Sequence, residues 1–287
     1  MQPRSVLPYK DAAIKRLQKK LHFTKLVKEQ RDIDPTYALE LPSEIGMKLT
    51  NRCDLRCAHC FQWNEEGYHK QLGKGDLKKD GDLDIGIVRE LLLKTKENKA
   101  DLYLWGGEPL MYSHWDELVE LLKEDPRDTV ICTNGLSVKR RLDSIVSISE
   151  RLTMLVSVEG LEDQHDSLRG KNTFRKVMEG LDELLQLQAT GVYKGFVSVA
   201  AVVSDELVPH LFDFCMYFEE KGVDTLSINY PWYIPDDVAF EMDAFFKEHY
   251  GWMETDRGWM NSWHSFHFRT SPHLHAMLMD QLEMVRN

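Results

Sequence analysis

Cysteine is scarce in this chain, and its distribution excludes one class of protein. The 287 residues include five cysteines, and none follows Cys215. Cys132 and Cys215 each stand alone among apolar neighbours, which is not the spacing of a disulfide framework. We therefore expect a reduced, cytoplasmic protein in which these two thiols are buried and inert.

The chain also lacks an excess of positive charge and any long apolar run. Lysine and arginine together number 36 against 47 aspartates and glutamates, which gives a net charge of −11. This balance argues against a partner that is nucleic acid or an anionic membrane. No apolar stretch approaches the length of a membrane span, and the N-terminus lacks the pattern of a signal peptide. A hydrophobic content of 43% is enough for one large α/β domain or two small ones.

Strands and helices are predicted to alternate through the middle of the chain. Short β-branched and apolar runs predict six strands, at 45–49, 101–105, 129–133, 152–157, 196–203 and 225–229. Helical periodicity falls between them, at 84–96, 114–123, 138–147, 174–188 and 206–221. This order predicts an α/β fold with a parallel sheet and right-handed crossovers, in which ligand sites collect at the carboxyl ends of the strands.

Three segments fall outside this alternation and set the predicted domain boundaries. Residues 1–43 read as an N-terminal helical extension packed on a core that covers 44–234. A polar, glycine-containing loop at 62–82 is predicted either as a lid or as a mobile surface loop. The tail at 235–287 is predicted to be helical or irregular and is rich in tryptophan and histidine. Its His264 and His267 could share a helix face and bind a metal, although packing and surface roles are the simpler interpretation.

The strongest local signal is a cluster of three cysteines directly after the first predicted strand. Cys53, Cys57 and Cys60 have gaps of three and two residues between them, so they supply three thiolates to one small volume. A structural zinc site and a fully protein-bound four-iron cluster both take four protein ligands. Three ligands therefore leave one metal position open for chemistry. The alternative is a zinc site whose fourth ligand is His59 or His69.

Further motifs follow at the ends of successive predicted strands. Two glycines remove side chains where a backbone must approach closely, and here a glutamate and a proline come directly after them. The run after the second strand is Gly106-Gly107-Glu108-Pro109, and the runs after the third and fourth are Thr133-Asn134-Gly135 and Ser157-Val158-Glu159-Gly160. His165-Asp166-Ser167-Leu168-Arg169-Gly170 comes next. The sixth strand exits into 229–233, an aromatic stretch that either lines a pocket or packs under the tail.

Taken together, these motifs resemble those of the radical S-adenosylmethionine (radical SAM) enzymes over residues 44 to about 230. The resemblance implies a partial (β/α)6 barrel of the TIM type. It also implies that Cys53, Cys57 and Cys60 hold three irons of a [4Fe-4S] cluster and that S-adenosyl-L-methionine binds the fourth. One-electron cleavage of this cofactor would then give a 5′-deoxyadenosyl radical that abstracts a hydrogen from the substrate.

The same resemblance assigns the other motif residues to the S-adenosylmethionine site. The Gly106–Pro109 run would bind the cofactor's amino group, with Asn134 nearby in the site. Arg169 would pair with the carboxylate, because a guanidinium matches a carboxylate in two hydrogen bonds. Ser157 would bond the ribose or carboxylate region. Because these positions adjoin the cluster cysteines, we also expect the backbone around His59 and the ring of Phe61 to flank the adenine.

The core is most similar to the subgroup of peptide maturases that carry a cysteine-rich C-terminal (SPASM) domain, but the cysteines of that domain are missing. Either this member has lost the domain, or the natural protein is longer; the ending at 282–287 resembles mid-helix sequence and favours the second. We expect a maturase acting on a ribosomally made precursor peptide, with flavodoxin or ferredoxin as electron donor. A radical oxidoreductase or decarboxylase acting on a sugar or nucleoside is the first alternative. A non-catalytic zinc-binding module is the second.

Overall fold

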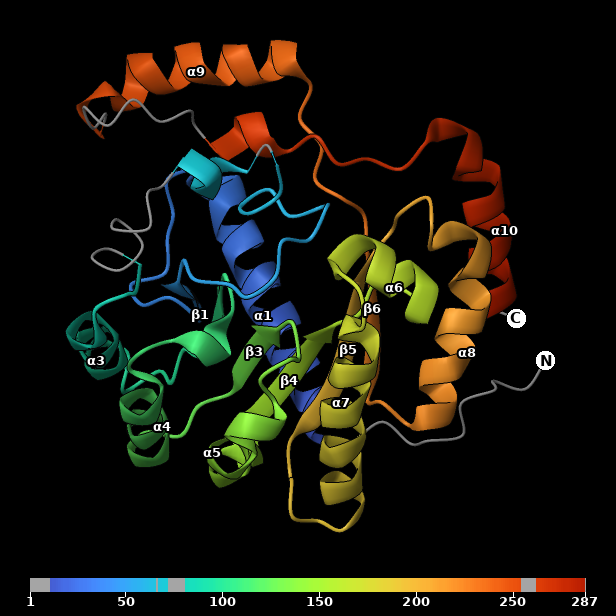
Figure 1. Ribbon diagram of the computed structural model, residues 1–287. Coiled ribbons are helices and arrows are strands. Elements are labelled where there is room, and N and C mark those ends of the chain that lie inside the picture. Colours follow the sequence, from blue (N-terminus) through green and yellow to red (C-terminus); the bar gives the residue numbers. More distant parts are fainter. Residues whose placement is uncertain (1–10, 66, 72–80, 254–261, 287) are drawn as a thin grey trace.

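The computed structural model describes residues 11–65, 67–71, 81–253 and 262–286. Its centre is one parallel sheet of six strands in the order β1-β2-β3-β4-β5-β6, which confirms the predicted α/β fold (Figure 1). The strands are β1 (Glu44–Thr50), β2 (Asp101–Gly106), β3 (Thr129–Thr133), β4 (Leu152–Ser157), β5 (Phe196–Val202) and β6 (Thr225–Asn229). Because consecutive strands are parallel neighbours, all six carboxyl ends lie at one end of the sheet.

Helices cover the outer face of the sheet, while α9 crosses one end of the molecule and α10 lies beside α8 (Figure 1). The α-helices are α1 (Asp11–Ile33), α3 (Ile85–Lys94), α4 (Trp115–Glu124), α5 (Leu142–Ser147), α6 (Glu162–Arg169), α7 (Thr173–Ala189), α8 (Leu211–Lys221), α9 (Asp236–Tyr250) and α10 (His275–Arg286). Single 3-10 turns are η1 (Tyr68–Gln71), η2 (Pro109–Met111), η3 (Lys139–Arg141), η4 (Ser149–Arg151), η5 (Val208–His210), η6 (Gly251–Met253), η7 (Ser262–Ser265) and η8 (Pro272–Leu274). None of these described helices combines the length and the apolar character needed to cross a bilayer.

The strands alternate between a buried outer face and a half-exposed inner face, as their period of two requires. The outer positions pack against the helices and are fully or nearly buried; in β2 to β5 they include Leu102, Leu104, Ile131, Met154, Val156, Val197 and Val199. The inner positions keep partial exposure and carry polar or aromatic side chains, such as Tyr103, Trp105, Cys132 and Ser157. The core therefore lies between sheet and helices, and the inner face is left for a ligand.

Two helices differ from their predicted form, and one was not predicted. The helices expected at 138–147 and 206–221 begin as 3-10 turns, η3 and η5, before α5 and α8. Pro209 in η5 lacks the N–H that an α-helix interior would use. Helix α6 was missed because it buries only His165 and Leu168 and has no apolar stripe of helical period.

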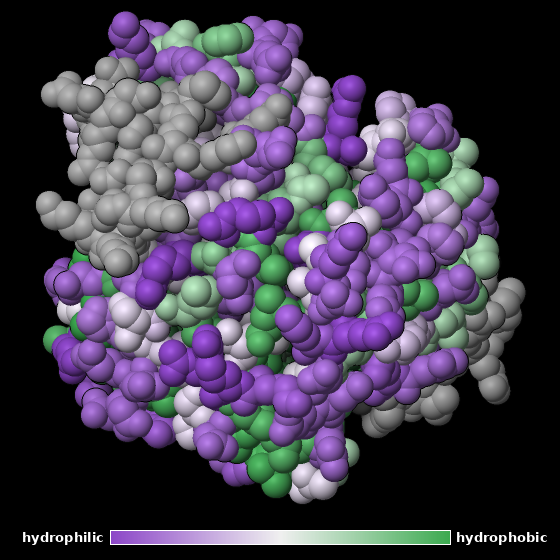
Figure 2. Space-filling view, viewed as in Figure 1, coloured by the Kyte–Doolittle hydropathy of each residue, from purple (hydrophilic) through white to green (hydrophobic). Residues whose placement is uncertain are grey.

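The N-terminal extension is helical as predicted, but its packing is only partial. Helix α1 runs across the amino-terminal end of the sheet and places Phe23 and Val27 toward the start of β1. Two of its apolar residues, Leu21 and Ile14, are 59% and 41% exposed. The tail forms α9 and α10, and its Trp259 lies outside the described residues. Seen from the same side as Figure 1, the surface is mostly hydrophilic, with hydrophobic residues emerging in a band down its middle (Figure 2).

Candidate functional site

The three clustered cysteines line one cavity of about 540 Å³ at the carboxyl ends of the strands. Cys57 is buried, whereas Cys53 and Cys60 are partly exposed to the cavity. Their loop is held by backbone bonds, among them one from the Cys60 N–H to the Cys57 carbonyl at 3.0 Å. Burial raises the pKa of the Cys53 thiol to about 12 and that of Cys57 to about 11. Both thiols are therefore protonated without a metal, and binding one would release protons.

This set of donors fits an iron–sulfur cluster better than a single ion. Within the described part of the chain, no three histidine, cysteine or acidic side chains are arranged to bind one metal ion. A four-iron cluster takes each thiolate on a different iron, so it does not require the sulfurs to meet at one point. The histidines proposed as a fourth zinc ligand have other partners: His59 contacts Glu159, and His69 contacts Lys48.

Gly106 and Gly107 bring the end of β2 against the backbone of the cysteine loop. The Gly107 N–H donates to the Thr50 carbonyl at 2.7 Å, and the next N–H, of Glu108, donates to the Arg52 carbonyl at 2.8 Å. A Cβ at Gly107 would lie 2.2 Å from the Arg52 oxygen, and one at Gly106 would lie 2.5 Å from the Thr50 oxygen. Both positions therefore require glycine for the close approach of two chain segments. Both glycines also line the cavity, where a ligand would meet their backbone.

The side chain of Glu108 links the end of β2 to the end of β3. Its carboxylate accepts bonds from the Leu110 N–H at 3.0 Å, the Thr133 hydroxyl at 2.7 Å and the Asn134 N–H at 2.7 Å. It is completely buried and is not among the described cavity-lining residues. Burial raises the pKa of Glu108 to about 7, against the three hydrogen bonds, which lower it. Pro109 is also buried and begins η2.

Asn134 connects the end of β3 to the cysteine loop. Its side-chain amide donates to Asp54 at 2.7 Å, while its oxygen accepts from the Leu136 N–H at 3.0 Å. Because Asn134 lines the cavity next to Cys53 and bonds Asp54, it holds the first part of the cysteine loop at the end of β3.

A buried network joins the predicted Arg169 to three neighbouring segments. Arg169, at the end of α6, donates from Nη2 and Nε to Glu159 Oε1 at 2.5 and 3.1 Å. Glu159 Oε2 accepts the Val202 N–H at 2.6 Å, and the His59 ring lies 3.4 Å from Oε1. Burial alone would raise the pKa of Glu159, but the Arg169 and His59 charges hold it well below its usual value. The remaining nitrogen of Arg169, Nη1, takes no part in the hydrogen bonds to Glu159.

Aromatic rings form one wall of the cavity near the cysteine loop. The Phe61 ring lies 4.4 Å from that of Phe266 and stacks on Trp232 at 6.2 Å between centroids. The His59 ring lies 5.6 Å from Phe268. The aromatic exit of β6 therefore lines the cavity through Trp232 and its neighbours, and the tail segment that contains Phe266 folds back over it.

Some cavity residues were not identified from the sequence. Cys132, expected to be buried and inert, is partly exposed and lines the cavity beside Tyr103 and Ser157. The place of Cys132 in the cavity could have been predicted, because Tyr103 and Cys132 occupy inner positions of strands that end in predicted motifs. Phe266 and Phe268 carried no such signal. Cys215, the other single cysteine, is also partly exposed, on α8.

Two histidines of the tail, His264 and His267, each lie next to an acidic residue. His264 is nearly buried, and its Nε2 lies 2.7 Å from Asp243 on α9. His267 lies 3.9 Å from Asp236, a different acidic residue of the same helix. The two histidines therefore pair with different acidic residues of α9, within the tail itself.

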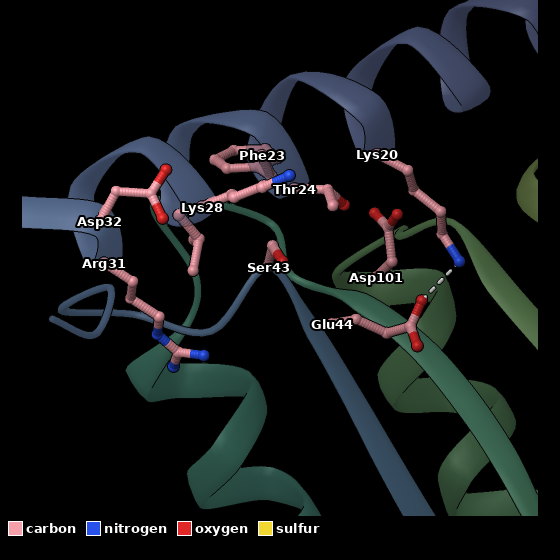
Figure 3. Close-up of a pocket in the computed structure, with 10 residues that line it drawn as sticks. Lys20, Phe23, Thr24, Lys28, Arg31, Asp32, Ser43, Glu44 and Asp101 are labelled. Atoms are coloured by element: carbon pink, nitrogen blue, oxygen red, sulfur yellow. Dashed lines mark ion pairs between the residues drawn. The ribbon is translucent and has the colours of Figure 1, made fainter. Parts of the chain in front are cut away.

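A second cavity, of about 580 Å³, lies at the opposite end of the sheet between α1 and the starts of β1 and β2. In Figure 3, Lys20 of α1 reaches Glu44 of β1, with 2.7 Å between the charged atoms, and Asp101 of β2 lies close by. None of the predicted motif residues is part of its described lining. Its position at the amino ends of the strands separates it from the cysteine loop.

Comparison with known proteins agrees with this geometry. Residues 47–215, more than half of the chain, match the model of the Radical SAM superfamily. The chain is 26% identical over 145 residues to the sporulation killing factor maturation protein SkfB of Bacillus subtilis, covering 50% of this chain and 33% of SkfB. It is 22% identical over 186 residues to a probable GTP 3′,8-cyclase of Methanococcus maripaludis, covering 64% and 58%.

The fold is also similar to that of a solved structure, Streptococcus suis SuiB bound to S-adenosylmethionine. The TM-score is 0.53 at 20% identity, with 96% of this chain and 60% of SuiB covered. The chain thus spans about a third to three fifths of these relatives. The matched residues contain the three cysteines and every strand-end motif up to Arg169. The chain belongs to the radical SAM superfamily of enzymes.

Proposed function

We propose that this radical SAM enzyme holds a [4Fe-4S] cluster on Cys53, Cys57 and Cys60 and modifies a ribosomally made precursor peptide. When bound, the cluster and S-adenosyl-L-methionine supply a 5′-deoxyadenosyl radical that takes a hydrogen atom from the substrate. The observation that carries the proposal is the single cavity in which the three thiols, the two glycines and an aromatic wall meet. The remaining steps concern what the residues of this chain do around these groups.

The strand ends supply partners for the polar groups of S-adenosylmethionine. The backbone of Gly106 and Gly107 is open to the cavity and would accept the amino group. Nη1 of Arg169 would bind the carboxylate, because Nε and Nη2 are already held by Glu159. Ser157 lines the same cavity and would bond the ribose or carboxylate region. Asn134 and the buried Glu108 would hold the surrounding loops in place rather than bind the cofactor.

The aromatic wall would receive the adenine and the substrate. Phe61 and His59 are the cavity residues adjacent to the cysteines, so their rings would flank the adenine and exclude water from it. Trp232 and Phe266 extend the wall outward. An extended apolar wall of this kind suits a peptide segment, which buries side chains at intervals.

The charge of the cavity favours a peptide over a nucleoside triphosphate. Apart from His59, Arg169 is the single basic side chain among the described lining residues, and Glu159 neutralises it. A triphosphate would need several basic groups or a metal in such a site. SkfB is named as a maturation protein, and a SuiB structure is titled as bound to its precursor peptide SuiA. Because a probable GTP 3′,8-cyclase is also among the relatives, a nucleoside is the alternative substrate for this chain.

The proposal is tested by anaerobic reconstitution and turnover. The wild-type protein is expected to become brown, with absorbance near about 400 nm from thiolate-bound iron. It should release 5′-deoxyadenosine with a reductant, and flavodoxin or ferredoxin is our proposed physiological donor. A short peptide encoded beside the gene should change mass after turnover.

Matched cysteine variants provide the control. Cys57→Ala should lose the cluster and 5′-deoxyadenosine formation, while Cys215→Ala, outside the cavity, should keep both. A colourless protein that binds zinc, or a Cys57→Ala protein that still forms 5′-deoxyadenosine, would overturn the assignment. Turnover of a nucleoside triphosphate with no change in any peptide would support the alternative. The predicted domain boundaries and cytoplasmic location remain predictions.

A further inference from the structure

Lys48 lies on the inner face of the sheet at its open edge. It pairs in register with Trp105, so the two side chains point to the same side of the sheet, and Trp105 lines the cavity. The Lys48 Nζ atom is 5.8 Å from the Trp105 ring. Among the six described strands β1 pairs only with β2, apart from an isolated bridge from Thr50 to Asp82, and it does not pair with β6, so the barrel is open between β1 and β6. Lys48 therefore stands beside the lateral opening of the active-site cavity.

Lys48 forms a small polar cluster with two residues of η1. Its Nζ atom lies 2.7 Å from the Tyr68 hydroxyl and 3.1 Å from His69 Nε2. We call these three residues the Lys48 cluster. An ammonium group is a donor only, so Tyr68 and His69 must accept its hydrogens. The His69 proton then belongs on Nδ1, which is buried without a partner among the described residues.

The bonding of the Lys48 cluster leaves donors but no matching acceptors. The third N–H of Lys48, the Tyr68 hydroxyl hydrogen and the His69 Nδ1–H remain unused within the cluster. No described carboxylate lies within ion-pair distance of Lys48, which is partly buried. Burial lowers the pKa of His69 to about 3 and that of Lys48 to about 8, so at neutral pH the lysine is the charged member. A donor that is shielded from water and has no acceptor destabilises the folded protein, and an incoming acceptor would relieve this.

The Lys48 cluster is separated from the cavity by one aromatic ring. The Phe61 ring, which lines the cavity, lies 6.0 Å from the Tyr68 ring. A peptide that enters between β1 and β6 would cross Phe61 to reach the thiols. A side chain next to the reacting residue would then fall within reach of Lys48.

We propose that the Lys48 cluster binds a carboxylate of the peptide substrate, from an aspartate, a glutamate or the chain end. This inference rests on the proposed function. A carboxylate carries one negative charge, which matches the one positive charge of the cluster, whereas a triphosphate carries several. Its two oxygens would accept from Lys48 and Tyr68. The Lys48 cluster thus selects for an acidic residue near the site of modification.

The test compares two blocked tripeptides on the anaerobically reconstituted full chain with S-adenosylmethionine and no reductant. N-acetyl-Ala-Glu-Ala-amide should bind about tenfold more tightly than N-acetyl-Ala-Gln-Ala-amide, measured by saturation-transfer NMR, since one charged hydrogen bond is of that size. Lys48→Met should remove the preference. Lys94→Met, on the exposed surface of α3, should keep it. Tyr68→Phe should reduce the preference by about threefold and serves if Lys48→Met does not fold.

Three results would overturn the inference. Equal binding of the two peptides to the wild type, or a preference that survives Lys48→Met, would exclude a carboxylate site here. Displacement of the glutamate peptide by inorganic phosphate at a lower concentration than by acetate would assign the site to a phosphate instead. Because binding is measured without turnover, a Lys48-dependent preference would stand even if no peptide proved to be modified. Peptide modification with no such preference would leave the proposed function intact and remove this inference alone.

Discussion

The buried pair Glu159–Arg169 gives the most demanding test of how this site is held together. Glu159 is 1% exposed and Arg169 is 8% exposed at the side chain. Glu159→Gln removes the negative charge and leaves the guanidinium buried without a counter-charge. It also turns one of the two accepting oxygens into an NH2 group, which only donates, so either the Arg169 bonds or the Val202 N–H bond is lost. The change therefore breaks an ion pair and a backbone bond together.

The size of this effect follows from the burial of the pair. Removing one partner of a buried ion pair costs about 3–5 kcal/mol, because the other charge is left unpaired in a low dielectric. A matched surface pair lies nearby, where Arg175 of α7 contacts Glu162 of α6 at 2.7 Å and the side chains are 72% and 41% exposed. Glu162→Gln should cost less than about 1 kcal/mol. The double variant Glu159→Gln/Arg169→Met should cost less than the sum of its single changes, since no lone charge remains.

The assay is urea unfolding of the reduced protein without metal, at several pH values. At pH 7 the Glu159→Gln protein should unfold at a clearly lower urea concentration than Glu162→Gln. The pKa of Glu159 is lowered in the folded protein from its ordinary value of 4.5. Its stabilisation is therefore complete above about pH 4.5 and is lost as the pH falls through the folded pKa. The difference between wild type and Glu159→Gln should shrink below about pH 4.5.

Two outcomes would refute this reasoning. Equal unfolding midpoints for Glu159→Gln and Glu162→Gln at pH 7 would mean that the buried pair adds nothing. A difference from wild type that stays constant down to pH 3 would mean that the charge of Glu159 is not the cause.

Two further predictions concern the strand-end motifs. Gly107→Ala forces a Cβ onto the Arg52 carbonyl and should destabilise the protein by about 1–3 kcal/mol or more in the same urea assay. Gly46→Ala, whose Cβ would make only an ordinary contact 4.0 Å from Trp105 Nε1, should stay within about 0.5 kcal/mol, and equal midpoints for the two variants would contradict the crowding argument. Glu108→Gln places an NH2 group against backbone donors such as the Asn134 N–H, at a cost of about 1–3 kcal/mol. Because the pKa of Glu108 is raised to about 7, its stabilisation is present at low pH and lost as the pH rises. The deficit of Glu108→Gln should therefore be larger at pH 5 than at pH 8, and a deficit that grows with pH would count against it.

The sheet could be predicted from the sequence because its strands are short, apolar and separated by helical periods. The predicted second strand, for example, matches β2 (Asp101–Gly106) to within one residue. The end of the sheet that carries the site also followed from the parallel order, since Cys53 comes after β1 and Gly106 and Ser157 end β2 and β4 of the same parallel sheet. Local sequence pattern and chain order are therefore enough to predict the strands and the end of the sheet at which the site lies.

Other features depend on contacts between distant segments, which no local pattern records. Phe266 reaches Phe61 from a tail segment more than two hundred residues later, and the sequence between them fixes neither its path nor its depth. Helix α6 was missed because its support comes from Arg169 and from backbone contacts rather than from an apolar stripe. The direction in which a motif side chain points could not be predicted from the sequence either. Glu108 is the clearest example, because its carboxylate bonds Thr133 and the Asn134 N–H instead of facing the cavity.

Several motif residues of this chain contact other parts of the protein rather than the cavity, so their main role here is structural. Gly107 brings the cysteine loop against β2, Glu108 ties β2 to β3, and Glu159 ties β4 to β5, to α6 and to His59. The single carboxylate of Glu159 reaches Arg169, the Val202 N–H and His59 at once. In our proposal the groups left for a cofactor are the glycine backbone, one nitrogen of Arg169 and Ser157, whose side chain also hydrogen-bonds Cys132. Substitutions at Glu108 and Glu159 should therefore show their effect in unfolding before any ligand is added, whereas a substitution at Ser157 should show it only in cofactor binding.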